Sequence, residues 1–575
     1  MRKQNNFNFC TVILTLLLLV QASQVIAGEA ANKSEDAPMP SSSGLTEANT
    51  VEATSPSDVK AKPLDNQTTS ADSEKKQSNK EVNYFDILEF QVQGNTKLTS
   101  EQVEAAVYPL MGEKKTIEDV EKAREALEKA YHQAGYLTAL VDIPEQDVDN
   151  KIVKLNVTEG KVSRLRIKDS DYFALGRIKT LAPSVKEGEV PHFPSLQKDM
   201  TRLNRTADKR VTPVMKAGKV FGTVDVDLKV EDSLPLHASL ELNDRYSQDT
   251  TRPRLGGSIR YDNLWQREHS LALNFLVSPE NTDEVRVLSA NYLMRFDDTD
   301  LLLAMYGIKS KSNVATVGGI DILGDGTILG VRLIKPLPSL DNYFHSASIG
   351  FDYKKFGQKI VFGDTSDTPV TYMPLAASYT GTWQETKSTT QFTTDVVVGI
   401  RGLVADEAEF ADRRQGVNGG EDAKPNFFVT KVELQRTQAL PNGFEGFAVL
   451  DAHYSGSPLI ANEQYLAGGL DTVRGYLESE ASGDRAVHTT LELRTPSLFK
   501  NTAWIKDFKV AAFYDMARLS TIDADSATLA GAGITLRLKA FNQFNVNLDF
   551  AVPLKDSFAT EQGDFRSHMR FWYEF

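Results

Sequence analysis

From His237 to Phe575 the sequence alternates apolar and polar residues with a period of two, and helical periodicity is absent. Successive side chains of a β-strand point to opposite faces, so this pattern predicts strands with one apolar and one polar face. In residues 544–552, for example, Phe544 and Val546 share a face opposite Asn545. Clusters of Gly, Pro, Asn and Asp mark the turns and divide the region into sixteen predicted strands. These are residues 237–244, 254–263, 270–278, 284–296, 301–310, 326–336, 345–356, 370–384, 390–402, 427–440, 444–456, 486–496, 507–519, 529–540, 544–554 and 567–575.

The predicted strands suit a transmembrane barrel. Most approach the ~9–11 residues that a tilted membrane strand needs, and their number is even. A water-soluble β-sandwich would alternate in the same way. The barrel is favoured by an export signal, by the lack of cysteine in so long an exported β region, and by an aromatic last strand ending at Phe575. A closed barrel leaves no unpaired sheet edge in hydrocarbon, so we expect residues 237–575 to form an all-β transmembrane barrel of sixteen antiparallel strands.

Residues 1–27 have the layout of a secretory signal peptide. Arg2 and Lys3 precede an apolar run over residues 12–20, and small residues precede Gly28. A membrane anchor is the alternative, for which the apolar run is short. Cys10, the single cysteine, lies ahead of this run, which argues against a lipoprotein and leaves the exported chain without disulfide or thiol chemistry.

Composition excludes further classes. After the signal, no run approaches the ~18–20 apolar residues of a spanning helix, so a polytopic helical membrane protein is excluded. The net charge of −14 falls to −16 when the two positive residues of the signal are removed, which argues against nucleic acid as a partner.

Residues 28–80 are rich in Ser, Thr, Ala, Glu and Pro and contain no aromatic residue. Such a segment cannot bury enough apolar surface to offset its ordering entropy, so we predict a disordered linker or arm. The apolar spacing of Leu45, Ala48 and Val51 is too faint to predict a helix that would plug a barrel.

Residues 81–236 mix helices and strands and repeat one order, β-α-α-β-β. The first module, 81–161, is predicted from a strand at 88–92, a helix capped by Thr99, a helix ending at Gly135, and strands at 138–143 and 152–157. The second, 162–236, has predicted strands at 162–167, 211–215 and 220–230 and helices at 175–181 and 196–203. Two such modules with exposed sheet edges favour a binding arm that accepts an extended peptide as an added strand. A single α+β domain without a partner is the alternative.

The long segment 457–485 separates two predicted strands and carries the sequence QYLAGGLDTVRGY at residues 464–476. This motif, the double module and the sixteen strands resemble the outer-membrane assembly and secretion superfamily, which joins POTRA modules to a sixteen-stranded barrel. Two modules make the chain most similar to the two-partner secretion transporters of the haemolysin and haemagglutinin secretion/activation type. The resemblance runs from about residue 81 to Phe575.

The resemblance implies that segment 457–485 folds back into the barrel lumen. Its arginine, Arg474, is then expected to pair with Asp515 of a wall motif, F-x-D-x-G, in which Phe513 shares the inward face and Ala517 replaces the glycine. Glu492, on another predicted inward face, is a second candidate acceptor. The implied motif residues of the loop are Gln464, Gly468, Gly469, Val473, Arg474, Gly475 and Tyr476.

A guanidinium offers a planar fork of donors that a carboxylate can accept bidentately, and either partner alone would be a partly desolvated charge. The pair is therefore expected to act as a latch for the loop, and reversal of both charges is expected to restore what either single reversal loses. The alternative is that Arg474 is a solvated loop residue.

The leading functional hypothesis is a pore of the Gram-negative outer membrane. Periplasmic POTRA modules would recognise a secreted exoprotein, which would cross the lumen unfolded. Expected partners are this exoprotein, outer-membrane lipid and, through the strand ending at Phe575, the barrel assembly machinery. A barrel insertase is the alternative, followed by a passive porin or surface receptor.

No enzymatic activity, cofactor or metal is expected. The sequence lacks HExxH, GxSxG and a cysteine nucleophile, the eight histidines are scattered, and a Walker A motif is absent.

Overall fold

The computed structural model describes residues 83–575 except 149, 249, 298, 313, 314, 318, 319, 323, 358, 362, 363, 367, 417–419, 500, 501 and 503. The predicted signal peptide with Cys10, the predicted linker and the faint spacing of Leu45, Ala48 and Val51 all lie outside the described residues. Within the described part of the chain, no helix is long and apolar enough to cross a membrane.

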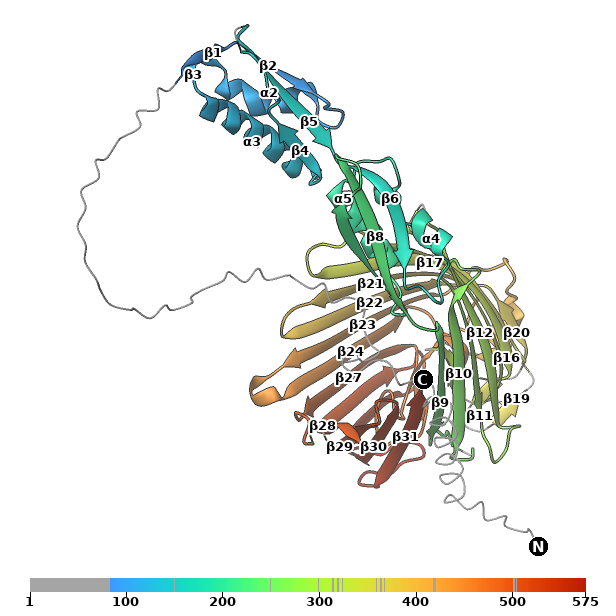
Figure 1. Ribbon diagram of the computed structural model, residues 1–575. Helices are drawn as coiled ribbons and strands as arrows, with labels where there is room; N and C mark the ends of the chain where they lie inside the picture. Colours follow the sequence, from blue (N-terminus) through green and yellow to red (C-terminus); the bar gives the residue numbers. More distant parts are fainter. Residues whose placement is uncertain are drawn as a thin grey trace, which may run out of the picture. The chain divides into compact units, whose positions relative to one another are not determined.

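A closed antiparallel barrel occupies the C-terminal region (Figure 1). Its strands are β9 (Leu236–Asn243), β10 (Arg254–Leu264), β11 (His269–Val277), β12 (Val285–Arg295), β13 (Leu302–Ser312), β16 (Gly326–Pro336), β17 (Tyr343–Phe356), β20 (Val370–Tyr372), β21 (Leu375–Gln384), β22 (Ser388–Val398), β23 (Phe428–Ala439), β24 (Glu445–Ser455), β27 (Arg485–Arg494), β28 (Ile505–Ser520), β29 (Ser526–Ala540), β30 (Phe544–Pro553) and β31 (Arg566–Glu574). Both β20 and β21 pair with β17 and are separated only by Met373 and Pro374, so they form one interrupted strand and the barrel has sixteen strands. Pairing of β31 with β9 closes it.

The predicted barrel is confirmed. Each of the sixteen predicted segments contains one strand, and most ends agree within two residues, because Gly, Pro, Asn and Asp turns stop the strands where the alternation stops. The alternation also predicts the two faces correctly. On β28, Phe513 and Asp515 are buried, whereas Tyr514 and Met516 between them are exposed on the outer face.

The first module has the expected two helices and three-stranded sheet. Its elements are β1 (Phe85–Ile87), β2 (Glu89–Gln93), α2 (Ser100–Val107), the 3₁₀ turn η1 (Tyr108–Leu110), β3 (Gly112–Lys115), α3 (Ile117–Gln133), β4 (Ala139–Asp142) and β5 (Ile152–Glu159). The sheet order is β2-β5-β4, with β2 and β5 parallel. A capping box at Thr99 starts α2, as predicted. The small β1–β3 pair was not predicted, because these strands have only three and four residues and too few positions to show a period.

A buried polar cluster surrounds Glu159, the last residue of β5 in the first module. Glu159 accepts hydrogen bonds from the Thr96 and Lys97 N–H groups and from the Tyr131 hydroxyl. Burial alone would raise the pKa of Glu159, but these donors outweigh it and hold the pKa below its ordinary value.

The second module repeats the fold. Its elements are β6 (Lys161–Lys168), α4 (Leu175–Thr180), the 3₁₀ turn η2 (Pro183–Val185), α5 (Phe193–Leu203), β7 (Lys209–Ala217) and β8 (Thr223–Asp232). The sheet order is β6-β8-β7, again with one parallel pair. Its core includes Ile178, Leu203 and Leu228, each fully buried. The five predicted elements of this module correspond to β6, α4, α5, β7 and β8.

The two faces of the barrel wall predict opposite responses to a charge. Leu273 lies on the outer face at the middle of β11, and Asn274 faces the lumen beside Ser289. We expect Leu273→Arg to destabilise the barrel by ~2–4 kcal/mol, because the arginine must enter hydrocarbon, and Asn274→Arg to cost much less. Reversible urea unfolding in phospholipid vesicles measures both. Equal costs would contradict the assignment of the faces.

Candidate functional site

The segment between β24 and β27 folds against the inner wall of the barrel. It contains a 3₁₀ turn, η4 (Ala461–Glu463), and a short antiparallel pair, β25 (Tyr465–Ala467) and β26 (Ala481–Gly483). Gly468 and Gly469 follow β25 with φ of +112° and +97°, a backbone region that favours glycine. A Cβ at Gly468 would lie 2.4 Å from the Leu477 carbonyl oxygen. The two glycines thus allow the tight reversal that brings residue 474 to the wall.

Arg474 lies at the far end of this reversal and is held by Asp515 of β28. Its Nε and Nη2 atoms donate to the two carboxylate oxygens at 2.7 and 2.9 Å, and its backbone N–H donates to Oδ2 at 3.1 Å. Asp515 is fully buried and Arg474 is 5% exposed. This is the bidentate, charge-assisted geometry that guanidinium and carboxylate favour. Arg474 is therefore not a solvated loop residue.

The Arg474 guanidinium also lies 3.5 Å from the centre of the ring of Phe513, which is on β28 like Asp515; this is a cation–π contact. Residues of three more wall strands complete the site. The Arg474 Nη1 donates to Glu492 of β27 at 2.8 Å and is 3.3 Å from Asp549 of β30. Thr535 of β29 accepts from the same nitrogen at 3.2 Å.

Two further arginines balance the acids. Arg494 and Arg537 both donate to Glu492 at 2.8 Å. With these two, the cluster holds three guanidinium groups and three carboxylates, and the carboxylates are all under 8% exposed. Because the charges cancel and every acid is bonded, the desolvation cost of each ion is offset within the cluster.

The neighbours of Arg474 in the loop motif are also bound to the wall. Val473 and Tyr476 are fully buried. The Tyr476 hydroxyl accepts from the Ala530 N–H at 3.3 Å and lies 2.8 Å from the Lys555 carbonyl oxygen, to which it can donate. Gly475 has a φ of +100°, and its N–H donates to Nε2 of His568 at 3.2 Å.

A second ionic anchor fixes the base of the loop. Asp484 accepts a bidentate pair of bonds from Arg414, at 2.5 and 2.9 Å, and a bond from Gln464 at 3.0 Å. Gln464 thus belongs to this anchor and not to the Arg474 cluster. Glu463 nearby accepts from Lys354 and Tyr372, each at 2.6 Å. Arg414 follows α6 (Glu407–Arg413) in the loop between β22 and β23.

Sequence reasoning missed several of these partners. The alternation places Asp549 on an inward face, but only the register across four strands shows that it reaches Arg474. No signal pointed to Arg414 or Asp484. The three-acid environment also alters the expected charge exchange, because a carboxylate at position 474 would face Glu492 and Asp549. Complete rescue by a two-residue exchange is therefore not expected.

Among the described residues, one group has donor atoms close enough for a metal ion: Asp208, His237 and Asp262, whose donor atoms lie within 4.8 Å of one another. His237 Nε2 is 3.0 Å from Asp208 and 3.4 Å from Asp262, and Asp262 also accepts from Arg260 at 2.8 Å. His237 and Arg260 thus already provide polar partners for both acids.

Comparisons with known proteins give consistent matches. Residues 85–160 match the POTRA domain of ShlB type, and residues 222–538 match the family described as haemolysin secretion/activation protein ShlB/FhaC/HecB. The chain is 22% identical over 494 residues to the heme/hemopexin transporter protein HuxB of Haemophilus influenzae, covering 82% of this chain and 84% of that protein. It is 23% identical over 181 residues to the outer membrane transporter CdiB of Dickeya dadantii, covering 32% of each chain. The structure of CdiB from Escherichia coli superposes with a TM-score of 0.60 at 18% identity, covering 88% of this chain and 93% of the other, and shows a common fold.

The geometry predicts strong coupling between Arg474 and Asp515. Either Arg474→Gln or Asp515→Asn leaves a buried charge without its main partner, and we expect each to destabilise the docked loop by ~3–5 kcal/mol. The double variant should cost less than the sum by ~1–3 kcal/mol, since it removes both charges. Protease cleavage within residues 457–485 of the detergent-solubilised barrel reports undocking.

Arg260→Gln is the matched control, because Arg260 is half exposed and pairs with Asp262 of its own strand, β10. Additive effects of the two single changes would contradict the coupling.

Proposed function

Because the chain belongs to the haemolysin secretion/activation family of ShlB, FhaC and HecB, we propose that it is an outer-membrane pore that passes a partner exoprotein, unfolded, from the periplasm to the cell surface. The observation that carries this proposal is the docked loop. A segment of the chain lies inside a closed barrel and is held by ion pairs, so its displacement would open a path without disturbing the wall.

The loop is held by contacts that can separate. Its start packs Leu459 and Ile460 into an apolar cluster with Phe410 and Tyr372, and its middle is bound through Arg474. The lumen face of the wall carries acids, arginines and amides, which water can solvate when the loop leaves. We infer that Val473, Arg474, Gly475, Tyr476, Gly468 and Gly469 form the docking element, that Asp515, Phe513 and Glu492 are its wall partners, and that Gln464 holds its base.

We infer that residues 81–161 and 162–236 are periplasmic POTRA modules and that residues 237–575 are the transport barrel. The names of HuxB and CdiB describe transporters, and the first names heme and hemopexin. For this chain we propose a secreted protein as the cargo, bound in extended form, and no catalytic step.

Both sheet edges of the second module are poorly suited to an added strand. At the outer edge of β7, the backbone N–H and C=O groups of Val211 are hydrogen-bonded to the Asn204 side chain, and Pro213 has no N–H. At the outer edge of β6, the Val162 and Leu165 N–H groups already donate to Glu189 and Glu187. These edges are therefore blunted against an added strand.

The β2 edge of the first module differs. The N–H of Leu88 donates to Lys151 across the β2–β5 pair, so by alternation the backbone groups of Glu89, Gln91 and Gln93 point away from the sheet. We therefore propose β2 as the edge that accepts the exoprotein.

Deletion of the gene tests the transport function. We expect loss of one exoprotein from the cell surface or medium, with its accumulation in the periplasm and with porin levels unchanged, as measured by quantitative proteomics of each fraction. General depletion of outer-membrane barrels would favour an insertase. A passive porin or surface receptor would not need the modules, so its activity would remain intact after removal of residues 84–230.

The β2 edge generates a separate prediction. Gln91→Pro removes one outward N–H and should weaken capture of the exoprotein roughly tenfold, since one ladder hydrogen bond is lost and the proline ring hinders the approach of a strand. Gln91→Ala keeps the N–H and is the control. Interferometry measures the affinity of each full-length variant for the secretion domain of the exoprotein. Equal affinities of the two variants would exclude β2 as the docking edge.

A further inference from the structure

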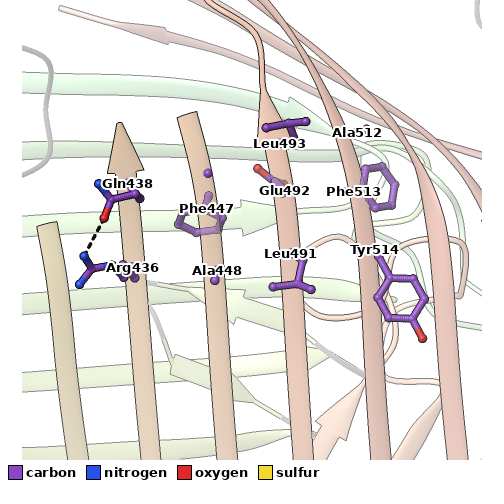
Figure 2. A pocket seen from close by; sticks show the side chains of 11 residues that line it. Arg436, Gln438, Phe447, Ala448, Leu491, Glu492, Leu493, Ala512, Phe513 and Tyr514 are labelled. Carbon is purple, nitrogen blue, oxygen red and sulfur yellow. Dashed lines mark hydrogen bonds between the residues drawn. The ribbon is translucent and has the colours of Figure 1, made fainter. Parts of the chain in front are cut away.

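A hollow of about 570 Å³ lies on the outer face of the barrel wall over β23, β24, β27 and β28. Two rows of Cα partners cross these strands. One row is Arg436, Ala448, Leu491 and Tyr514, and the next is Gln438, Gly446, Leu493 and Ala512. Glu492 and Phe513, between the rows, point into the lumen and join the Arg474 cluster. The two rows therefore face outward (Figure 2).

Small residues form the floor of this hollow and large apolar residues its walls. Gly446, Ala448 and Ala512 have little or no side chain, so the backbone there is close to the surface. Leu491, Leu493 and Tyr514 stand beside them, 50%, 50% and 40% exposed. The result is a concave apolar surface on the face that meets lipid, within the size range of small-ligand pockets.

A cation stands at the rim. Arg436 donates through Nη2 to Gln438 at 2.6 Å (Figure 2) and through Nη1 to Thr390 at 2.8 Å. These bonds fix the guanidinium in place and leave its remaining N–H donors available. An arginine on the lipid face costs ~2–4 kcal/mol at the bilayer midplane and about 0–1 kcal/mol near an interface, so the depth of Arg436 decides what it can bind.

The chain direction places Arg436 near the periplasmic interface. The barrel chain enters from the modules at β9, and antiparallel strands alternate in direction, so β23, the tenth strand, ends on the side where β9 begins. Arg436 lies three residues before the end of β23. In the same row Thr390 pairs with Trp383, whose ring stacks on Tyr343 at 4.2 Å. Such aromatic residues concentrate at membrane–water interfaces.

We propose that this hollow binds a glycerophospholipid of the periplasmic leaflet. The phosphate would accept charge-assisted hydrogen bonds from Arg436 at the rim, and one acyl chain would lie over Gly446, Ala448 and Ala512 between the leucines and Tyr514. The row that begins at Arg436, three residues from the end of β23, passes through Ala448 and Leu491 and reaches Tyr514, nine residues from the start of β28. Both of these strand ends are on the periplasmic side, so the apolar wall runs from the charged side chain into the membrane. The site is independent of the exoprotein path, since its side chains leave the wall on the opposite face from the loop.

Native mass spectrometry of the full chain in detergent tests the site, with phosphatidylglycerol as the titrant. We expect saturable binding of one lipid that weakens roughly tenfold in Arg436→Gln, which keeps the length of the side chain and removes the charge. Ala448→Leu fills the floor and should weaken binding similarly; where it fails to assemble, Leu491→Ala replaces it. The control is Lys335→Gln, an outward cation at the same end of the barrel but on β16.

Equal binding by all variants would show that the lipid is only part of the general annulus and would overturn the proposal. Glycerol 3-phosphate distinguishes the source of the phosphate. It should bind at least tenfold more weakly than phosphatidylglycerol, because it lacks the chain that the hollow accommodates; comparable affinity would assign Arg436 to free phosphate and contradict a lipid site.

Discussion

A sheet that crosses hydrocarbon has to pair every backbone N–H and C=O group within itself, and the pairing of β31 with β9 is what meets this requirement here. Closure then sets the chemistry of both faces. Residues on the outer face must be apolar where they meet the hydrocarbon, with polar residues such as Arg436 near the strand ends, while residues on the inner face surround a lumen and are free to carry charge. The strands between His237 and Phe575 thus hold leucines and aromatics outside and the acids and arginines of the site inside. The loop site exists because the wall has a polar side.

The Arg474 cluster connects the loop to several strands on that polar side. One guanidinium reaches residues of four adjacent strands, β27 to β30, so a single loop residue is tied to a broad part of the wall. Arg494 and Arg537 also donate to Glu492, so Arg474 shares that acid with them while it binds Asp515 through two nitrogens. Tyr476, the neighbouring glycine and Val473 supply neutral contacts around the ion pair. Hydrogen-bond geometry therefore fixes the position of the Arg474 side chain, and the cation–π contact with Phe513 strengthens the binding of the loop to the wall.

The sequence predicted the barrel well because strand alternation is a local property. A run such as Phe544 to Val552 shows its two faces without reference to any other strand. The helices of the modules were equally visible from caps and apolar stripes, as at Thr99 and Gly135. The pairing of Arg474 with Asp515 came from the resemblance to a family. The contribution of Asp549 and the Arg414–Asp484 anchor could not be predicted, because they depend on register across strands and on how a long loop folds, which no local pattern encodes.

The ion pairs at Arg474, which add to the apolar packing of Leu459, Ile460 and Val473, suit the displacement of the loop that we propose. An apolar plug that leaves a wet lumen exposes its surface and that of the wall to water, at ~25 cal/mol per Å², and nothing returns that free energy. A neutral cluster of three arginines and three acids behaves differently, since water entering the lumen can solvate each ion as its partner departs. The same desolvation that makes removal of one partner expensive in the closed state is returned when the whole site becomes wet. In the proposed mechanism, a loop held in this way would be rigid while the lumen is filled and would separate at lower cost once an entering chain brings water with it.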